Sequence, residues 1–148
     1  MKKLFSTILV VAGFSFLMAQ TPDVPTGVKV AFKNAYKSTT VEWTTTSQYY
    51  VAKWVTSEKN MTAYYAKVNE ASLVRTETEV PLTQLSTSAQ NSANTFLTNG
   101  SQYTLNRAFK VENMAEVAEG IEFNMSTGGK ISVFYNAGGT MTKREISQ

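Results

Sequence analysis

The sequence contains no histidine and no cysteine among its 148 residues. Common zinc sites, thiol nucleophiles and Ser-His-Asp triads are built from these residue types, so all three kinds of chemistry are excluded. Carboxylates remain, because two glutamates at a suitable separation are sufficient for glycoside hydrolysis. We nevertheless expect no metal, no cofactor and no catalytic residue in this chain.

Two groups of glutamates are close in sequence. Glu77 and Glu79 are two residues apart in a strand-like segment, which places both side chains on one face. The other group is an acidic cluster formed by Glu112, Glu116, Glu119 and Glu122. No partner that would tune these carboxylates is evident in the sequence, so we expect strand-end and loop side chains that keep a sheet soluble. An enzyme that uses paired glutamates is therefore the third of three hypotheses.

Aromatic side chains give the positive indication of function. A helix covers only one face of a sheet, so the other face is solvated or binds something. Strand parity places Tyr50, Ala52, Trp54, Tyr65, Val133 and Tyr135 toward the helices, and we expect Trp43 and Trp54 to be largely buried there. The same parity places Tyr49, Val51, Lys53, Val55, Tyr64 and Phe134 on the opposite, exposed face. Such an apolar patch favours an interface, although cross-strand pairs that only stiffen the sheet have the same pattern.

The first hypothesis is thus a non-enzymatic binding protein whose open sheet face holds a protein or peptide. The second is a small apolar or carbohydrate ligand held between the two halves of the chain. An enclosed apolar cavity would favour the ligand, and a flat, open aromatic face would favour the protein partner. The oligomer we expect is a monomer or a weak homodimer.

The elements that carry these residues begin after a targeting segment. Residues 1–19 combine Lys2-Lys3, an apolar run and the small Ala19, a pattern typical of a signal peptide cleaved after Ala19 or Gln20. The run is shorter than the roughly 20 apolar residues that span a bilayer. We therefore expect a periplasmic or secreted protein with no membrane insertion after cleavage.

The charge of the chain changes when this segment is removed. The whole sequence carries 14 Lys+Arg and 11 Asp+Glu, and loss of Lys2 and Lys3 leaves 12 against 11, a net charge of +1. A nucleic-acid partner therefore has little electrostatic support. The 129 residues after Ala19 suit one compact domain or two small ones that share a sheet.

Residues 24–79 predict one helix followed by four strands. Val24, Val28, Phe32 and Tyr36 form an apolar stripe at helical spacing after Pro25. The period then changes to two, which predicts strands over 39–45, 49–56, 61–66 and 72–79, with a turn at residues 58–60.

Residues 80–146 predict the same order. A helix over 82–97 ends at Asn99-Gly100, and two alternating stretches, 103–111 and 117–125, follow. Gly128-Gly129 turns the chain into a strand over 131–135, which is followed by a return strand. The extra length of this half falls around residues 112–116, where we expect a loop or an extended hairpin.

The two halves look like one unit used twice. Val24-Pro25 and Val80-Pro81 open matching segments, and Tyr64-Tyr65 and Phe134-Tyr135 end matching strands. With Val41-Glu42-Trp43, Tyr50-x-Ala52-x-Trp54 and Leu73-x-x-Thr76-Glu77, the pattern resembles the PepSY-like family, also described as β-lactamase-inhibitor-like.

This resemblance covers nearly all of the chain after the signal segment. It implies an α+β fold with a first PepSY-like repeat over 20–79 and a second over 80–148, helices on one face of an antiparallel sheet. It also implies an exported protein and raises an envelope or secreted hydrolase as the partner that is inhibited or modulated. The family's usual Asp-x-Asp-Gly turn is replaced here by Asn136-Ala137-Gly138-Gly139, which argues against a cation site.

Overall fold

The computed structural model describes residues 22–37, 40–69, 72–98 and 102–147. The predicted signal peptide and the predicted helix end at Asn99-Gly100 lie outside these residues. In chain order the elements are α1 (Thr26–Tyr36), β1 (Glu42–Thr45), β2 (Tyr49–Thr56), β3 (Lys59–Ala66), β4 (Leu73–Val80), the 3₁₀ helix η1 (Leu82–Gln84), α2 (Thr87–Thr98), β5 (Tyr103–Glu112), β6 (Glu119–Met125), β7 (Lys130–Tyr135) and β8 (Met141–Ser147). The α+β class is therefore confirmed.

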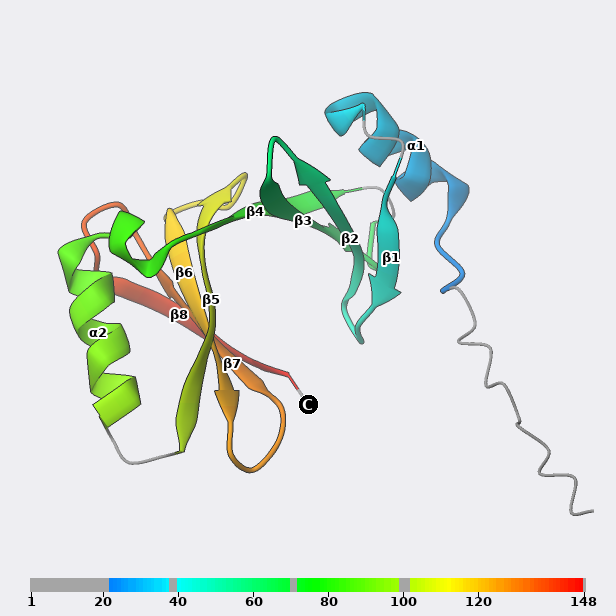
Figure 1. Ribbon diagram of the computed structural model, residues 1–148. Helices are drawn as coiled ribbons and strands as arrows, with labels where there is room; N and C mark the ends of the chain where they lie inside the picture. Colours follow the sequence, from blue (N-terminus) through cyan, green and yellow to red (C-terminus); the bar gives the residue numbers. More distant parts are fainter. Residues whose placement is uncertain (1–21, 38–39, 70–71, 99–101, 148) are drawn as a thin grey trace, which may run out of the picture.

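The strands form one antiparallel sheet in the order of the sequence, from β1 to β8. β4 pairs with β5 over Thr76–Val80 and Ala108–Glu112, so the two halves share one continuous sheet. Figure 1 shows that this sheet is strongly curled, with α1 and α2 near its opposite ends on the outer side. The described chain therefore has a convex face that carries the helices and a concave face that the helices leave open.

α1 packs on the first four strands through the stripe that the sequence predicts. Val28 and Phe32 are buried, and the Phe32 ring meets those of Trp43 and Trp54 edge-on, with centroids 5.5 and 5.0 Å apart. Trp54 is 6% exposed, as expected, whereas Trp43 is only half-buried because it lies on the edge strand β1. Pro25 precedes the helix, and Lys37 ends it in the left-handed conformation.

The second helix covers the other half of the sheet, but its predicted extent is wrong. The segment over 82–97 divides into η1 and α2, because Leu85 adopts an extended backbone and buries its side chain in the core. The Ser86 hydroxyl then accepts a hydrogen bond from the backbone N–H of Ala89, which begins a new helix. Ala89 and Ala93 let α2 pack closely on Ile121, Phe123 and Val133.

A β-bulge in β5 corrects a second prediction. The pairing shifts register between Leu105 and Arg107, which leaves Asn106 as the extra residue. An extra residue reverses the faces of all that follow it. Leu105 pairs with Phe123 of the helix-side core, whereas Arg107 pairs with Glu122 on the concave side. The apolar alternation over 103–111 is therefore not one face of one strand.

Other boundaries shift by a few residues. The β2–β3 turn is at Ser57-Glu58, which both have positive φ, and Lys59 and Asn60 already belong to β3. The extra length between β5 and β6 is a loop, as predicted. That the halves are copies of one repeat stays a prediction. None of the described helices has the length and apolar character needed to cross a membrane.

Candidate functional site

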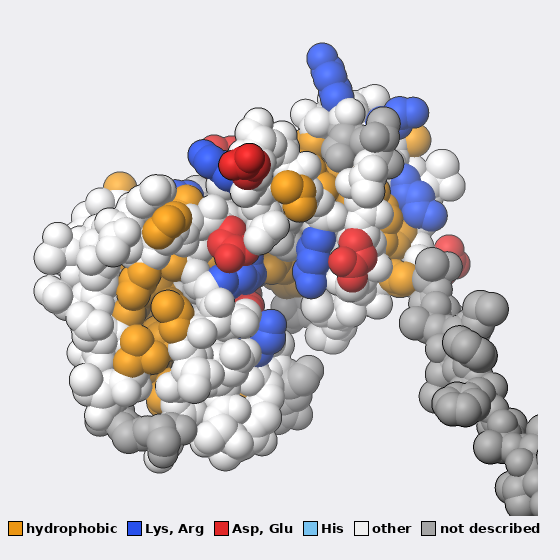
Figure 2. All heavy atoms as spheres, in the orientation of Figure 1, with side chains coloured by type: hydrophobic (Ala, Val, Ile, Leu, Met, Phe, Trp, Pro, Cys, Tyr) orange, Lys and Arg blue, Asp and Glu red, His pale blue; other side chains and the backbone are white. Residues whose placement is uncertain are grey.

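The concave face encloses an open hollow of about 1180 Å³. Side chains from both halves line it, from Glu42 on β1 to Ser147 on β8, and none of its lining residues comes from a helix. Figure 2 shows acidic and basic side chains gathered over this part of the surface, with apolar groups beside them. The hollow is therefore neither the enclosed apolar cavity expected for a small ligand nor the flat aromatic face expected for a protein partner.

Strand parity is correct for the predicted site residues. Tyr49, Val51, Lys53, Val55 and Tyr64 all line the hollow, and Ala52, Trp54 and Tyr65 pack on α1. Lys53 and Val55 are exposed, and Tyr49 and Tyr64 are half-buried, but the expected exposure of Val51 is wrong, since this side chain is only 4% exposed. Their binding role stays a prediction.

The expected exposure of Phe134 is wrong, because this ring is completely buried. It lies on the concave side, but Met114 and Val117 of the β5–β6 loop pack over the small core that it forms with Phe109 and Val111. Gly120 makes room for the two rings, since a Cβ there would lie 2.5 Å from Phe109 and 3.3 Å from Phe134. Phe134 is thus a core residue that holds the loop.

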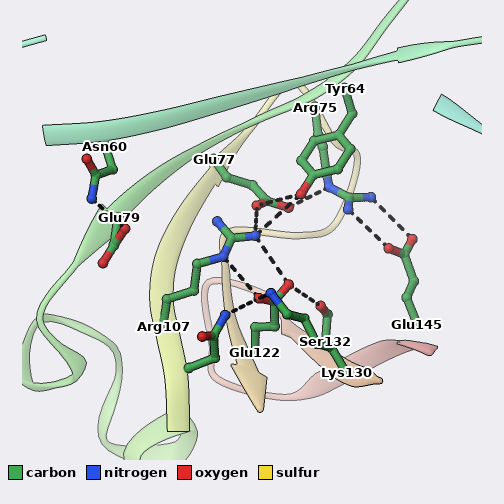
Figure 3. A network of polar contacts seen from close by, with 11 residues as sticks. Asn60, Tyr64, Arg75, Glu77, Glu79, Arg107, Glu122, Lys130, Ser132 and Glu145 are labelled. Carbon is green, nitrogen blue, oxygen red and sulfur yellow. Dashed lines mark hydrogen bonds and ion pairs between the residues drawn. The ribbon is translucent and has the colours of Figure 1, made fainter. Parts of the chain in front are cut away.

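A network of ion pairs forms the floor of the hollow. Glu77, 1% exposed, lies between two guanidinium groups, with one carboxylate oxygen 2.7 Å from Arg75 Nε and the other 2.6 Å from Arg107 Nη2. The Tyr64 hydroxyl donates a hydrogen bond of 3.2 Å to the same carboxylate. Figure 3 shows these groups converging from β3, β4 and β5. Glu77, for which no partner is evident in the sequence, therefore has three partners in the structure.

Glu122 extends this network into the second half. Its carboxylate accepts hydrogen bonds from Arg107 Nε at 3.4 Å, from Lys130 Nζ at 3.1 Å and from the Ser132 hydroxyl at 3.4 Å. The Asn106 amide also donates to it, which the bulge in β5 permits. These contacts satisfy a charge that would otherwise be costly to bury.

Arg75 links the middle of the sheet to its last strand across the hollow. Its guanidinium lies 3.9 Å from the centroid of the Tyr64 ring, and its two Nη groups donate to Glu145 at 3.1 and 3.2 Å. Arg75 is on β4 and Glu145 is on β8, which would lie about 19 Å apart in a flat sheet with ordinary strand spacing. The contact therefore exists only because the sheet is curled, and it helps to hold the curl.

The network shifts the pKa values of its two arginines, of Tyr64 and of Glu122 and Glu145. Burial alone would lower the pKa values of Arg75 and Arg107, but Glu77 and the other anionic neighbours together outweigh it and raise both. Burial and the Glu77 carboxylate raise the pKa of Tyr64 to about 12. Burial would raise the pKa values of Glu122 and Glu145, yet their cationic partners outweigh burial and lower both pKa values.

We expect the network to make the free energy of unfolding depend on pH in the acid range. Glu122 and Glu145 have folded pKa values below their ordinary value of 4.5, so their contribution is complete above about pH 4.5 and is lost as the pH falls through the folded values. Urea unfolding between pH 7 and pH 3 measures this dependence. Glu122→Gln should flatten the fall, and a stability that rises with acid in the same window would contradict the assignment.

The other candidate carboxylates do not form one site. Glu119 lies on the helix side, where Lys110 Nζ is 2.7 Å away and the Ser86 N–H donates to both its oxygens at 3.1 Å. It thus satisfies a backbone N–H just ahead of α2. Glu112 and Glu116 are exposed, and Glu79 accepts a hydrogen bond from Asn60. Within the described ranges, no three acidic side chains gather as metal ligands.

Sequence reasoning missed the two arginines on which the site depends. One signal was available, because Arg107 interrupts an otherwise apolar alternation, and a charge in such a place needs a buried partner. The partner could not be identified, since Glu77 and Arg107 are 30 residues apart and the bulge decides which face Arg107 occupies.

Comparisons with known proteins relate the chain to others through its fold. No family model matches the sequence, and no curated protein sequence matches it significantly. Among solved structures, a DUF2874 family protein from Bacteroides ovatus is 21% identical over 84% of this chain and 89% of its own, with a TM-score of 0.57. A protein from Bacteroides eggerthii, provisionally described as periplasmic, is 16% identical over 83% and 88%, also with a TM-score of 0.57.

A third solved structure of the same fold is described as BLIP-like. A BLIP-like protein from Bacteroides fragilis is 17% identical over 83% of this chain and 86% of its own, with a TM-score of 0.52. BLIP-like here means β-lactamase-inhibitor-like. At these identities the comparisons show a shared fold, and the likeness spans most of each chain.

Proposed function

We propose that the protein is an exported, non-enzymatic binding protein whose concave sheet face holds a segment of a partner protein. One observation carries the proposal, namely a wide, open hollow lined from both halves over a rigid ion-paired floor. Exposed Val55 and half-buried Tyr49 and Tyr64 lie around that floor. Aromatic anchors beside satisfied polar groups are the usual composition of protein interfaces.

The shape and the charge of the hollow favour a protein segment over a small apolar ligand. Pockets for small apolar ligands are mostly apolar and surround their occupant. Here the floor consists of Arg75, Arg107, Glu122 and Glu145, and the hollow is open. An apolar ligand would cover these groups without replacing the water that solvates them.

The compartment and the class of partner are part of the same proposal. The signal-like pattern of residues 1–19 supports a periplasmic or secreted protein. The provisional periplasmic description of one structure of this fold agrees with that, and the BLIP-like description of another supports an exported hydrolase as the partner. On this proposal the two halves of the chain together build one binding face.

Two exposed valines, one in the hollow and one outside it, allow a matched test. Val55 is 65% exposed at the hollow, and Val68 is 80% exposed in the β3–β4 connection outside it. Val55→Arg should reduce capture of a partner from the native envelope extract at least tenfold, about 1.4 kcal/mol, because the long charged side chain obstructs the hollow. Val68→Arg should capture as much as the parent protein does.

Affinity capture followed by mass spectrometry measures both variants against the parent. Equal capture by the parent, Val55→Arg and Val68→Arg would remove the concave face as the binding site. A partner identified as a second copy of this chain would replace the hydrolase with self-association, which sedimentation of the parent protein and Val55→Arg would confirm.

A further inference from the structure

The most exposed charged groups of the network are two lysines. The side chains of Lys130 and Lys143 are 45% and 44% exposed, whereas those of the carboxylates Glu77, Glu122 and Glu145 are 1%, 12% and 25% exposed. The network holds four cationic groups, Arg75, Arg107, Lys130 and Lys143, and three carboxylates, Glu77, Glu122 and Glu145, so it retains one net positive charge. An approaching molecule therefore meets the ammonium groups of Lys130 and Lys143 first.

The same groups keep unused hydrogen-bond donors. Lys130 Nζ and Lys143 Nζ each contact one carboxylate oxygen, and an ammonium group has three donors. Arg107 uses Nε and Nη2, and its Nη1 donates no hydrogen bond among the described residues. Figure 3 shows this terminal nitrogen directed away from the network. The buried carboxylates, by contrast, are already surrounded by donors.

Two acidic side chains of the first half, Glu42 and Glu79, also line the hollow but lie away from these cations. Glu42 lies directly across from Lys53 on the neighbouring strand, so these two charges offset each other. Glu79 keeps its charge, because its hydrogen bond comes from the neutral Asn60 amide, but Figure 3 shows this pair apart from the network. The hollow therefore carries separate patches of charge, and its cationic patch belongs to β5, β7 and β8, which carry Arg107, Lys130 and Lys143.

We infer that the hollow selects a partner segment that carries carboxylates, and that these contact Lys130, Lys143 and the free end of Arg107. The inference rests on the proposed function and adds the chemistry of the partner. Glu77 and Glu122 hold Arg107 in place from below, so little side-chain entropy is lost when the free end binds. A carboxylate then receives charge-assisted hydrogen bonds from groups already oriented toward it.

Three extended decapeptides test this selectivity, with Ser alternating with Glu, Gln or Lys. Fluorescence anisotropy should show that the purified protein binds the Ser-Glu peptide at least tenfold more tightly than either of the others. The affinity should fall in about 1 M salt, where charges are screened within about 3 Å. Equal binding of all three peptides, or no binding of the Ser-Glu peptide, would overturn the inference.

Substitutions at the exposed lysines locate the site. Lys130→Gln combined with Lys143→Gln should weaken Ser-Glu binding at least tenfold, and thermal unfolding should confirm that these exposed changes leave the fold intact. Lys29→Gln combined with Lys33→Gln, which removes the same charge from the exposed side of α1, should leave the affinity unchanged. Equal effects of the two double variants would overturn the assignment to the hollow.

The peptide test and the capture test fail independently. If the peptides show no selectivity for carboxylates but capture still depends on Val55, the preference for carboxylates is overturned and the binding function remains. If peptide selectivity depends on Lys130 and Lys143 but capture does not depend on Val55, the carboxylate site is supported and only the proposed function is overturned.

Discussion

Glu77→Gln is expected to lower the free energy of unfolding by about 3 to 5 kcal/mol. The substitution keeps the shape of the side chain and removes its charge. Arg75, which is 3% exposed, and Arg107 would then lose the carboxylate that lies 2.7 and 2.6 Å from them. The cost arises because two like charges remain in a largely buried site with less compensation. Urea unfolding at pH 7 measures it.

Glu79→Gln is the matched control for this change. Glu79 is on the same strand and faces the same side, but it is half-buried and its hydrogen bond with Asn60 is exposed, so we expect a loss below about 1 kcal/mol. The triple variant Arg75→Met, Glu77→Leu, Arg107→Met should recover most of the stability, since apolar side chains of similar size can replace a buried ionic network. Equal losses for Glu77→Gln and Glu79→Gln would show that the floor is solvated.

Phe134→Ala is expected to cost about 3 to 5 kcal/mol, as truncation of a buried aromatic side chain does. Phe134 is fully buried, its centroid is 5.9 Å from that of Phe109, and the β5–β6 loop packs over both rings. The truncation leaves a cavity, and the residues that line it relax only in part. Thermal and urea unfolding of the variant measure the loss.

Tyr49→Ala distinguishes a rim residue from this core residue. Tyr49 is half-buried and meets Tyr64 edge-on at 5.7 Å, an arrangement of a cross-strand pair that contributes about 0.2 to 1 kcal/mol. We expect Tyr49→Ala to unfold nearly as the parent protein does and to bind the partner at least tenfold more weakly. A loss of stability as large as that of Phe134→Ala would make Tyr49 a structural residue.

Local patterns in the sequence were sufficient for the element order and for the faces of most strands. The stripe of Val28 and Phe32 predicts the helix that covers the first half, because an amphipathic helix buries its apolar side wherever it packs. Alternation in 49–56 correctly separates Trp54 from Val55, since successive side chains of a regular strand point to opposite faces.

Those patterns failed where one residue interrupts the regular geometry. Leu85 leaves the helical conformation to enter the core, and Asn106 inserts into β5 and turns Arg107 to the concave side. Both departures are decided by what lies opposite the residue in the folded chain. A periodicity argument contains no information about those neighbours.

The chemistry of the site was decided by the tertiary structure. Residue types established which chemistries are excluded, since a chain without histidine or cysteine lacks them in every conformation. The floor of the hollow, by contrast, depends on contacts such as that between Arg75 and Glu145, which are 70 residues apart in the chain. These two meet only because β4 pairs with β5 and the joined sheet curls, and that pairing and curvature arise from the packing of all eight described strands.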